Sequence, residues 1–213
     1  GNPDAHKETK EGLKADVIWD MKMDAPYMVF KGTQLKGKSL GILGYGSIGK
    51  RVGRIARAFG MQLLIYDPYQ GEVDIEEIGI RKVNTLAELM RESDFVTCHM
   101  KVTPETTGIV SREMISLMKP TAYFINASRG AILDEQALID ALREKRIAGA
   151  AFDVYASEPI ASNHPYVTEL DNVVITPHIA GATDDVLVNH TKQIVADIRR
   201  FLNGEHLLYQ YRY

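Results

Sequence analysis

Three polar segments in the second half of the chain carry side chains suited to redox chemistry on a small organic acid. Each follows a short apolar run, and they contain Arg129, Glu158 and His178 in turn. The planar, permanently charged fork of Arg129 could grip a carboxylate and polarise a neighbouring carbonyl group. His178 could supply or take a proton near neutral pH, and a nearby Glu158 would favour its charged form. Hydride transfer to or from a 2-keto acid needs these two activities, although each residue taken alone could be an ordinary surface residue.

A glycine-rich segment in the first half of the chain is suited to binding the dinucleotide that such a transfer requires. Residues 44–49 read GYGSIG, a GxGxxG pattern that follows an apolar run and opens a segment of helical periodicity. In this pattern Gly44 allows a tight turn, Gly46 lets a diphosphate approach the backbone, and Gly49 lets the helix pack closely on a sheet. The alternative is a glycine-rich turn in an unrelated α/β fold, which the strand, turn and helix context disfavours.

The residues around this turn also indicate which dinucleotide binds. Backbone N–H groups near Ser47 and Ile48, at the positive end of the helix dipole, would hold the diphosphate. Asp67 ends the next apolar run, close to the spacing of about 20 residues expected for an acid that binds ribose. Its carboxylate can accept hydrogen bonds from the ribose hydroxyls and would repel a 2′-phosphate. The sequence therefore predicts NAD rather than NADP as the cofactor.

Apolar runs alternate with segments of helical periodicity after residue 38, and this alternation predicts the elements that position the polar groups. Strands are expected at 39–43, 62–66, 81–83, 95–98, 122–126, 147–154 and 173–175, and helices at 6–14, 48–59, 74–78, 86–91, 111–118, 134–145 and 183–203. Such alternation is typical of an α/β fold, a Rossmann-like doubly wound parallel sheet. Since the carboxyl ends of parallel strands share one crevice, the three polar segments should converge there.

Composition and charge exclude several other classes of function. The 213 residues carry a net charge of −3 with no basic run, which argues against a nucleic-acid or membrane-surface partner. No apolar run reaches the roughly 18 residues of a membrane span. The single cysteine, Cys98, suits a reducing cytoplasm and is interpreted as a small buried residue rather than a nucleophile. No spacing of histidine, cysteine and acidic residues predicts a metal site.

The motifs that contain these residues resemble those of the D-isomer-specific 2-hydroxyacid dehydrogenases, which include phosphoglycerate, glycerate and D-lactate dehydrogenases. The resemblance extends over about 37–204 and depends on LKGKSLGILGYGSIGKRV, SDFVTCHMKVTPETTGIV, FINASRGAILDEQAL, GAAFDVYASEP and NVVITPHIAGAT. It implies an NAD-dependent oxidoreductase in which Arg129 binds the substrate, His178 is the acid/base and Glu158 is its partner. The related formate dehydrogenases have glutamine at the position of Glu158, which argues against formate as the substrate.

The resemblance also implies which residues surround the cofactor. Asp153 would lie near the nicotinamide carboxamide, and Ala127, Ala180 and Gly181 would line the cofactor. The remaining positions expected at the cofactor are His99, Met100, Ser128, Arg129 and His178.

The chain departs from the family pattern in two places. Lys101 stands where the family usually has proline, and we hypothesise that its charge favours an acidic or phosphorylated substrate. Family members also carry a substrate domain of about 100 residues before the cofactor domain. Only an arm at 1–36 precedes the NAD-binding domain expected at 37–182, and a C-terminal helix and tail at 183–213 follow it. The substrate domain is therefore expected to be missing, and this chain alone to be weakly active or inactive.

Two further expectations concern partners and an alternative function. Family members are commonly dimers through the cofactor domain, so a cytoplasmic homodimer acting on a small 2-hydroxy or 2-keto acid is expected. The alternative is an NAD-sensing binding module of the corepressor type, which has the same fold and resembles the dehydrogenases at the same three residues. Turnover would separate the two, because a sensor would bind NADH without useful reaction.

Overall fold

The computed structural model describes residues 31–69 and 79–208 of the chain. These residues belong to two units that divide after Pro177, and each unit is described by itself. The helices expected at 6–14 and 74–78 lie outside the described residues.

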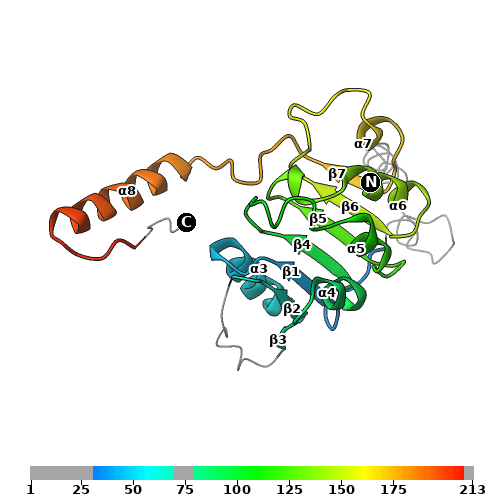
Figure 1. Ribbon diagram of the computed structural model, residues 1–213, viewed down its shortest axis with the longest axis horizontal. Coiled ribbons are helices and arrows are strands. Elements are labelled where there is room, and N and C mark those ends of the chain that lie inside the picture. Colours follow the sequence, from blue (N-terminus) through cyan, green and yellow to red (C-terminus); the bar gives the residue numbers. More distant parts are fainter. Residues whose placement is uncertain (1–30, 70–78, 209–213) are drawn as a thin grey trace, which may run out of the picture. The chain divides into compact units, whose positions relative to one another are not determined.

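A parallel sheet forms the centre of the first unit (Figure 1). In the described residues its strands run β3-β2-β1-β4-β5-β6-β7, and every neighbouring pair is parallel. They are β1 (Ser39–Leu43), β2 (Gln62–Tyr66), β3 (Ile80–Lys82), β4 (Phe95–Cys98), β5 (Tyr123–Asn126), β6 (Gly149–Phe152) and β7 (Val173–Ile175). Because the strand order reverses between β1 and β4, the predicted doubly wound, Rossmann-like fold is confirmed.

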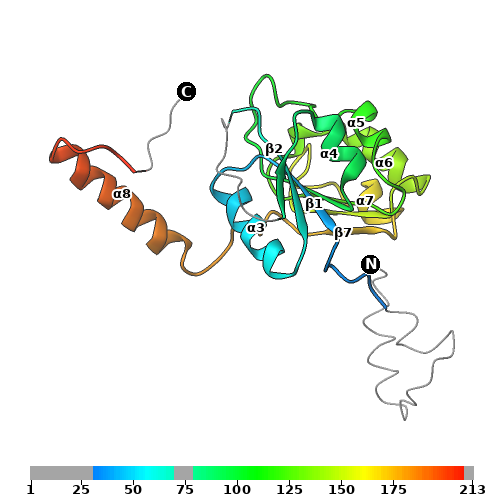
Figure 2. The same cartoon turned by 90° about the horizontal axis from the view of Figure 1, so that it is seen from below.

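Helices cover both faces of this sheet (Figure 2). They are α3 (Ser47–Ala58), α4 (Leu86–Glu92), α5 (Arg112–Ser116), the 3₁₀ helix η1 (Gly130–Ile132), α6 (Glu135–Arg143) and α7 (Pro165–Thr168). Side chains alternate along β2, so Leu63 and Ile65 pack with Ala56 of α3, whereas Leu64 packs with residues of α4 and α6. Strand β2 therefore contributes to two hydrophobic cores, one on each face.

Capping side chains determine where several helices begin. Thr85 accepts a hydrogen bond from the Glu88 N–H, Ser111 from the Met114 N–H and Asp134 from that of Ala137. These caps confirm the helix starts predicted at residues 111 and 134. Helix α3 differs, because its N-cap is Gly46, which has no side chain to occupy the helix end.

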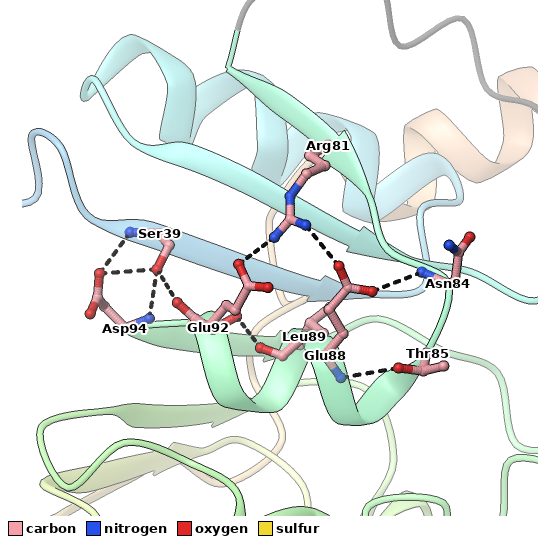
Figure 3. A network of polar contacts seen from close by, with 9 residues as sticks. Ser39, Arg81, Asn84, Thr85, Glu88, Leu89, Glu92 and Asp94 are labelled. Atoms are coloured by element: carbon pink, nitrogen blue, oxygen red, sulfur yellow. Dashed lines mark hydrogen bonds and ion pairs between the residues drawn. The ribbon is translucent and has the colours of Figure 1, made fainter.

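A polar network fastens the amino ends of the central strands (Figure 3). The Asp94 carboxylate accepts hydrogen bonds from the backbone N–H of Ser39 at 2.9 Å and its hydroxyl at 3.0 Å, and from Lys119 Nζ at 2.9 Å. Burial raises the pKa of Asp94, but the hydrogen bonds from Ser39 and Lys119 outweigh it, so the pKa lies below its usual value. This network lies at the opposite end of β1 from the glycine-rich turn.

Two elements differ from the sequence prediction. The strand expected at 147–154 extends only over Gly149–Phe152, and the segment between it and the strand expected at 173–175, for which no helix was predicted, contains α7. Pro165 stands at the start of α7, and the Nδ1 atom of His164 accepts a hydrogen bond from the Tyr166 N–H at 3.2 Å. A proline after a capping side chain is a helix-start signal, so α7 could have been found in the sequence.

The second unit contains helix α8 (Val186–Leu202), which begins slightly after the expected start at residue 183. None of the residues of α8 is buried within the described structure. Its exposed large apolar side chains include Leu187, Ile194, Ile198, Phe201 and Leu202. No helix among residues 31–69 and 79–208 is long and apolar enough to cross a membrane.

Candidate cofactor site

The turn between β1 and α3 has a backbone that only glycine allows at two positions. Gly44 has φ +87°, and a Cβ placed on it would lie 3.0 Å from the backbone of His99 and Met100. A Cβ on Gly49 would lie 2.2 Å from the Gly44 carbonyl oxygen. Gly46 is different, because a Cβ there would meet no atom within 4 Å. Gly44 and Gly49 are therefore needed to build the turn, and Gly46 leaves the outer side of the turn open.

Helix α3 presents its N-terminus at this open side. Its first intrahelical hydrogen bond runs from the Lys50 N–H to the Gly46 carbonyl, so the N–H groups of Ser47 and Ile48 precede the helical ladder. Both residues are exposed, and the first turn of α3 contains no acidic residue. N–H donors together with the positive end of a helix dipole form a site for an anion such as a diphosphate.

Asp67 lies beside the same turn, directly after β2. One carboxylate oxygen accepts a hydrogen bond from the Tyr45 N–H at 2.7 Å, and the other accepts one from the Tyr69 N–H at 2.9 Å. The first of these bonds links Asp67 to the glycine-rich turn itself. The residues present therefore fit a dinucleotide, with an open anion-binding turn next to a carboxylate that can receive a ribose diol.

The segment after β4 forms another wall of the site. The His99 N–H donates to the Leu43 carbonyl at 2.7 Å, and its Nε2 atom lies 3.0 Å from the Thr97 hydroxyl. Burial lowers the pKa of His99, which favours the neutral form of its ring. Met100 is buried and Lys101 is exposed, with the Lys101 carbonyl accepting a hydrogen bond from the Thr106 hydroxyl at 2.6 Å.

The segment after β5 is organised by Asn126, a buried residue that the sequence analysis did not identify. Its amide donates to the Arg129 carbonyl at 3.0 Å, and its Oδ1 atom accepts from the Ser128 N–H at 3.0 Å. Ala127 and Arg129 are exposed on the resulting turn. The Ser128 hydroxyl lies 3.3 Å from Cys98 Sγ, and burial raises the pKa of that thiol. Cys98 is thus a buried, neutral thiol, as the sequence interpretation expected.

Close backbone contacts bring the segments after β5 and β6 together. A Cβ on Gly130 would lie 2.1 Å from the Tyr155 carbonyl, so these two loops touch directly. The Tyr155 N–H donates to Glu158 Oε1 at 3.1 Å. The segments that carry Arg129 and Glu158 therefore lie next to each other.

The end of β7 joins the same group of loops. Asp153 is buried, and its Oδ1 atom accepts a hydrogen bond from the Thr176 hydroxyl at 2.6 Å. The Tyr155 hydroxyl donates to the Thr176 carbonyl at 2.7 Å. Thr176 was not identified from the sequence, because its role depends on these contacts between strand ends.

The remaining predicted site residues, His178, Ala180 and Gly181, belong to the second unit. All three are exposed, and His178 has φ +55°. The convergence of His178 with Arg129 and Glu158 stays a prediction. In the part of the chain that the structure describes, no three histidine, cysteine or acidic side chains are grouped to hold a metal ion.

The sheet is doubly wound and parallel, and the glycine-rich start of α3 lies where the strand order reverses, next to an acid at the end of β2. These features define a dinucleotide-binding Rossmann domain. Residues 5–180 match the sequence profile described as the D-isomer specific 2-hydroxyacid dehydrogenase, NAD binding domain. The chain belongs to this family and contains its NAD-binding domain.

Named relatives agree with this assignment. The D-3-phosphoglycerate dehydrogenase of Synechocystis sp. is 40% identical over 202 residues, which are 95% of this chain and 34% of that protein. The glyoxylate reductase of Aeropyrum pernix is 38% identical over 187 residues, 88% of this chain and 55% of that protein. The chain therefore spans between about a third and somewhat over half of these relatives.

Solved structures show the same fold. The D-lactate dehydrogenase of Aquifex aeolicus, complexed with NAD and lactic acid, has a TM-score of 0.73 and 31% identity, covering 95% of this chain and 62% of that one. An acyclic imino acid reductase in complex with NADPH and D-Arg has a TM-score of 0.77 and 29% identity, covering 94% and 60%.

Proposed function

We propose that the protein carrying this chain transfers a hydride between NAD and a D-2-hydroxy acid or the matching 2-keto acid. The observation that carries the proposal is the contact of Gly130 with Tyr155 at the carboxyl edge of the sheet. This contact supports the proposal, because the segments after β5 and β6 meet at the same edge of the sheet as the open turn after β1. When bound, the nicotinamide would supply or receive the hydride.

The chain's own residues would bind and orient the substrate and move its proton. Arg129 would grip the substrate carboxylate and polarise the carbonyl, because its guanidinium matches a carboxylate with two parallel hydrogen bonds. His178 would give a proton to the carbonyl oxygen during reduction and take it back during oxidation. Glu158 would orient His178 and favour its protonated form. His178 follows Thr176 by two residues, and Thr176 is bonded to Asp153 and Tyr155.

Around the cofactor we propose the roles implied by the sequence. Asp153 would lie near the nicotinamide carboxamide, where its bond from the Thr176 hydroxyl holds it in place. Ala127, Ser128, Ala180 and Gly181 would line the cofactor. We also propose NAD rather than NADP as the cofactor used, because the carboxylate of Asp67 would repel a 2′-phosphate.

We also propose an oligomeric state, a cellular location and domain boundaries for the protein. A homodimer formed through the cofactor domain is proposed from the family resemblance. A cytoplasmic location fits the single, buried and reduced Cys98. Domain boundaries at residues 36 and 182 are likewise proposed, and limited proteolysis would locate them.

The proposed function is tested by following NADH absorbance with the full-length protein and a panel of 2-keto acids. We expect keto-acid-dependent NADH oxidation, and a loss of at least a hundredfold in kcat/KM for Arg129→Gln and for His178→Gln. Both variants should still bind NADH, with a loss of affinity smaller than the loss of kcat/KM. NADH binding without turnover of any keto acid in the panel would instead support the NAD-sensing module.

A further inference from the structure

The loop after β6 carries Glu158, and a side chain from α6 holds the start of this loop. The Tyr155 N–H donates to Glu158 Oε1 at 3.1 Å, so Glu158 folds back onto the start of its own loop. The next backbone N–H, that of Ala156, donates to Glu135 Oε1 at 3.4 Å. Glu135 is the first residue of α6, so its carboxylate ties the loop to the helix at the point from which Glu158 projects.

The second carboxylate oxygen of Glu135 contacts the other end of the same loop. Glu135 Oε2 lies 3.6 Å from Nε2 of His164, the N-cap residue of α7. The two side chains are only 23% and 19% exposed. His164 Nδ1 accepts a hydrogen bond from the Tyr166 N–H at 3.2 Å, so a neutral ring carries its proton on Nε2, facing the carboxylate. The contact therefore does not require a protonated histidine.

Two aromatic contacts hold His164 against the end of β6. Its ring centroid lies 4.7 Å from that of Tyr166, which is only 3% exposed. Tyr166 in turn stacks on Phe152, the last residue of β6, with the centroids 4.5 Å apart. The carboxylate of Glu135 thus completes a closed series of contacts from the end of β6 through α7 and α6 to the start of the loop. Such a series gives the loop that carries Glu158 a rigid support.

Joining α6 to α7 is not enough to explain this arrangement, because a second ion pair already joins the two helices. Arg143, the last residue of α6, lies 2.5 Å from Glu169, which directly follows α7. These side chains are 46% and 48% exposed. The pair of Glu135 with His164 differs in two respects: it is more buried, and one oxygen of its carboxylate accepts a hydrogen bond from the backbone of the loop.

We propose that Glu135, supported by His164, is a positioning residue for the reaction described above. By holding the Ala156 N–H, it fixes the segment from which Glu158 would orient the acid/base His178. This inference rests on the proposed function, because Glu135 acts only through Glu158. A displaced loop would slow proton transfer rather than weaken NADH binding, and a misplacement of about 1 Å can slow a reaction by up to about a hundredfold.

The test is steady-state kinetics of the full-length protein with NADH and the 2-keto acid that it reduces fastest. Glu135→Ala should lower kcat about tenfold and leave the KM for NADH within about twofold of the wild type. Glu135→Gln keeps an oxygen for the Ala156 N–H, so a loss in kcat of only about threefold is expected. His164→Asn keeps a capping oxygen for α7 but is too short to reach Glu135, so it should also lower kcat about threefold.

A double variant and a matched control separate positioning from general destabilisation. The protein that combines Glu135→Ala with Glu158→Gln should be no slower than Glu158→Gln alone, because Glu135 acts through Glu158. Two independent losses would multiply instead. Glu169→Ala is the matched control, since it breaks the ion pair at the far ends of the same two helices, and its kcat should equal that of the wild type.

The outcomes distinguish this proposal from the proposed function. Wild-type kcat in Glu135→Ala beside an impaired Glu158→Gln would overturn the proposal and leave the proposed function standing. Multiplied losses in the double variant, or a loss in Glu169→Ala equal to that in Glu135→Ala, would also overturn it. Absence of turnover in the wild type, or wild-type kcat in Glu158→Gln, would contradict the proposed function and this inference with it. Should Glu135→Ala fail to fold, the same comparisons apply to Glu135→Gln, which preserves the side-chain volume.

Discussion

Alanine at position 46 should weaken dinucleotide binding at least a hundredfold and leave the fold intact. The backbone of Gly46 has φ −74° and ψ −159°, which alanine adopts without strain, and a Cβ there meets no atom within 4 Å. The free energy of unfolding should therefore change by less than about 1 kcal/mol. The same Cβ would project from the open side of the turn, where a diphosphate has to approach the backbone.

The size of the binding defect follows from the hydrogen bonds that the diphosphate would lose. A hydrogen bond to a charged group contributes about 1.5–3 kcal/mol. If the added methyl group prevents the N–H groups of Ser47 and Ile48 from reaching the phosphates, roughly 3–6 kcal/mol is lost. Since each 1.4 kcal/mol is about tenfold, NADH affinity should fall at least a hundredfold.

Two further alanine variants make the comparison decisive. Gly49→Ala places a Cβ 2.2 Å from the Gly44 carbonyl oxygen, so it should lower stability by about 1–3 kcal/mol as well as binding. Gly32→Ala meets no atom within 4 Å and lies outside the turn, so it should change neither property. Urea unfolding and NADH fluorescence titration measure the two quantities. Wild-type NADH affinity in Gly46→Ala, or unfolding of that variant, would refute the reasoning.

Two other predictions concern the ends of the strands. The pKa of Asp94 is lowered in the folded state, so its contribution to stability is present above its ordinary value near 4 and disappears as pH falls below it. Asp94→Asn should lose about 1–2 kcal/mol of unfolding free energy at neutral pH, and the difference from wild type should shrink on acidification; a constant difference in urea titrations would contradict this. Gly130→Ala would force Tyr155 away from the Arg129 turn, so kcat for keto-acid reduction should fall at least tenfold while NADH affinity stays within about threefold. Equal kcat values for the variant and the wild type would show that this contact does not position the site.

Local sequence signals predicted most of the elements because they depend on periodicity and on caps. The cap residues Ser111 and Asp134 stand where their helices begin, and the spacing of the glycines located the turn. The strand expected at 147–154 was too long, because apolar residues flank Gly149–Phe152 on both sides, whereas pairing with β5 and β7 is confined to that range. An apolar run in the sequence indicates which residues are buried, but it does not indicate where the hydrogen bonds between neighbouring strands end.

The contacts between strand ends could not be predicted from local sequence. Thr176 and Tyr155 act through partners far along the chain, such as the bond from Thr176 to Asp153. A buried polar side chain needs a partner, but the sequence does not say which one. The contact between the Tyr69 and Thr103 hydroxyls, which lie 3.3 Å apart, is of the same kind, since it depends on how close the loops after β2 and β4 lie.

The central claim is that the open turn and the Asp67 carboxylate together bind NAD. The most direct measurement is calorimetric titration of the wild-type chain and Asp67→Asn with NADH and with NADPH. We predict that the wild type binds NADH at least tenfold more tightly than NADPH, and that Asp67→Asn loses most of this preference through weaker NADH and tighter NADPH binding. Absence of binding heat with both dinucleotides, or an unchanged preference in the variant, would contradict the account.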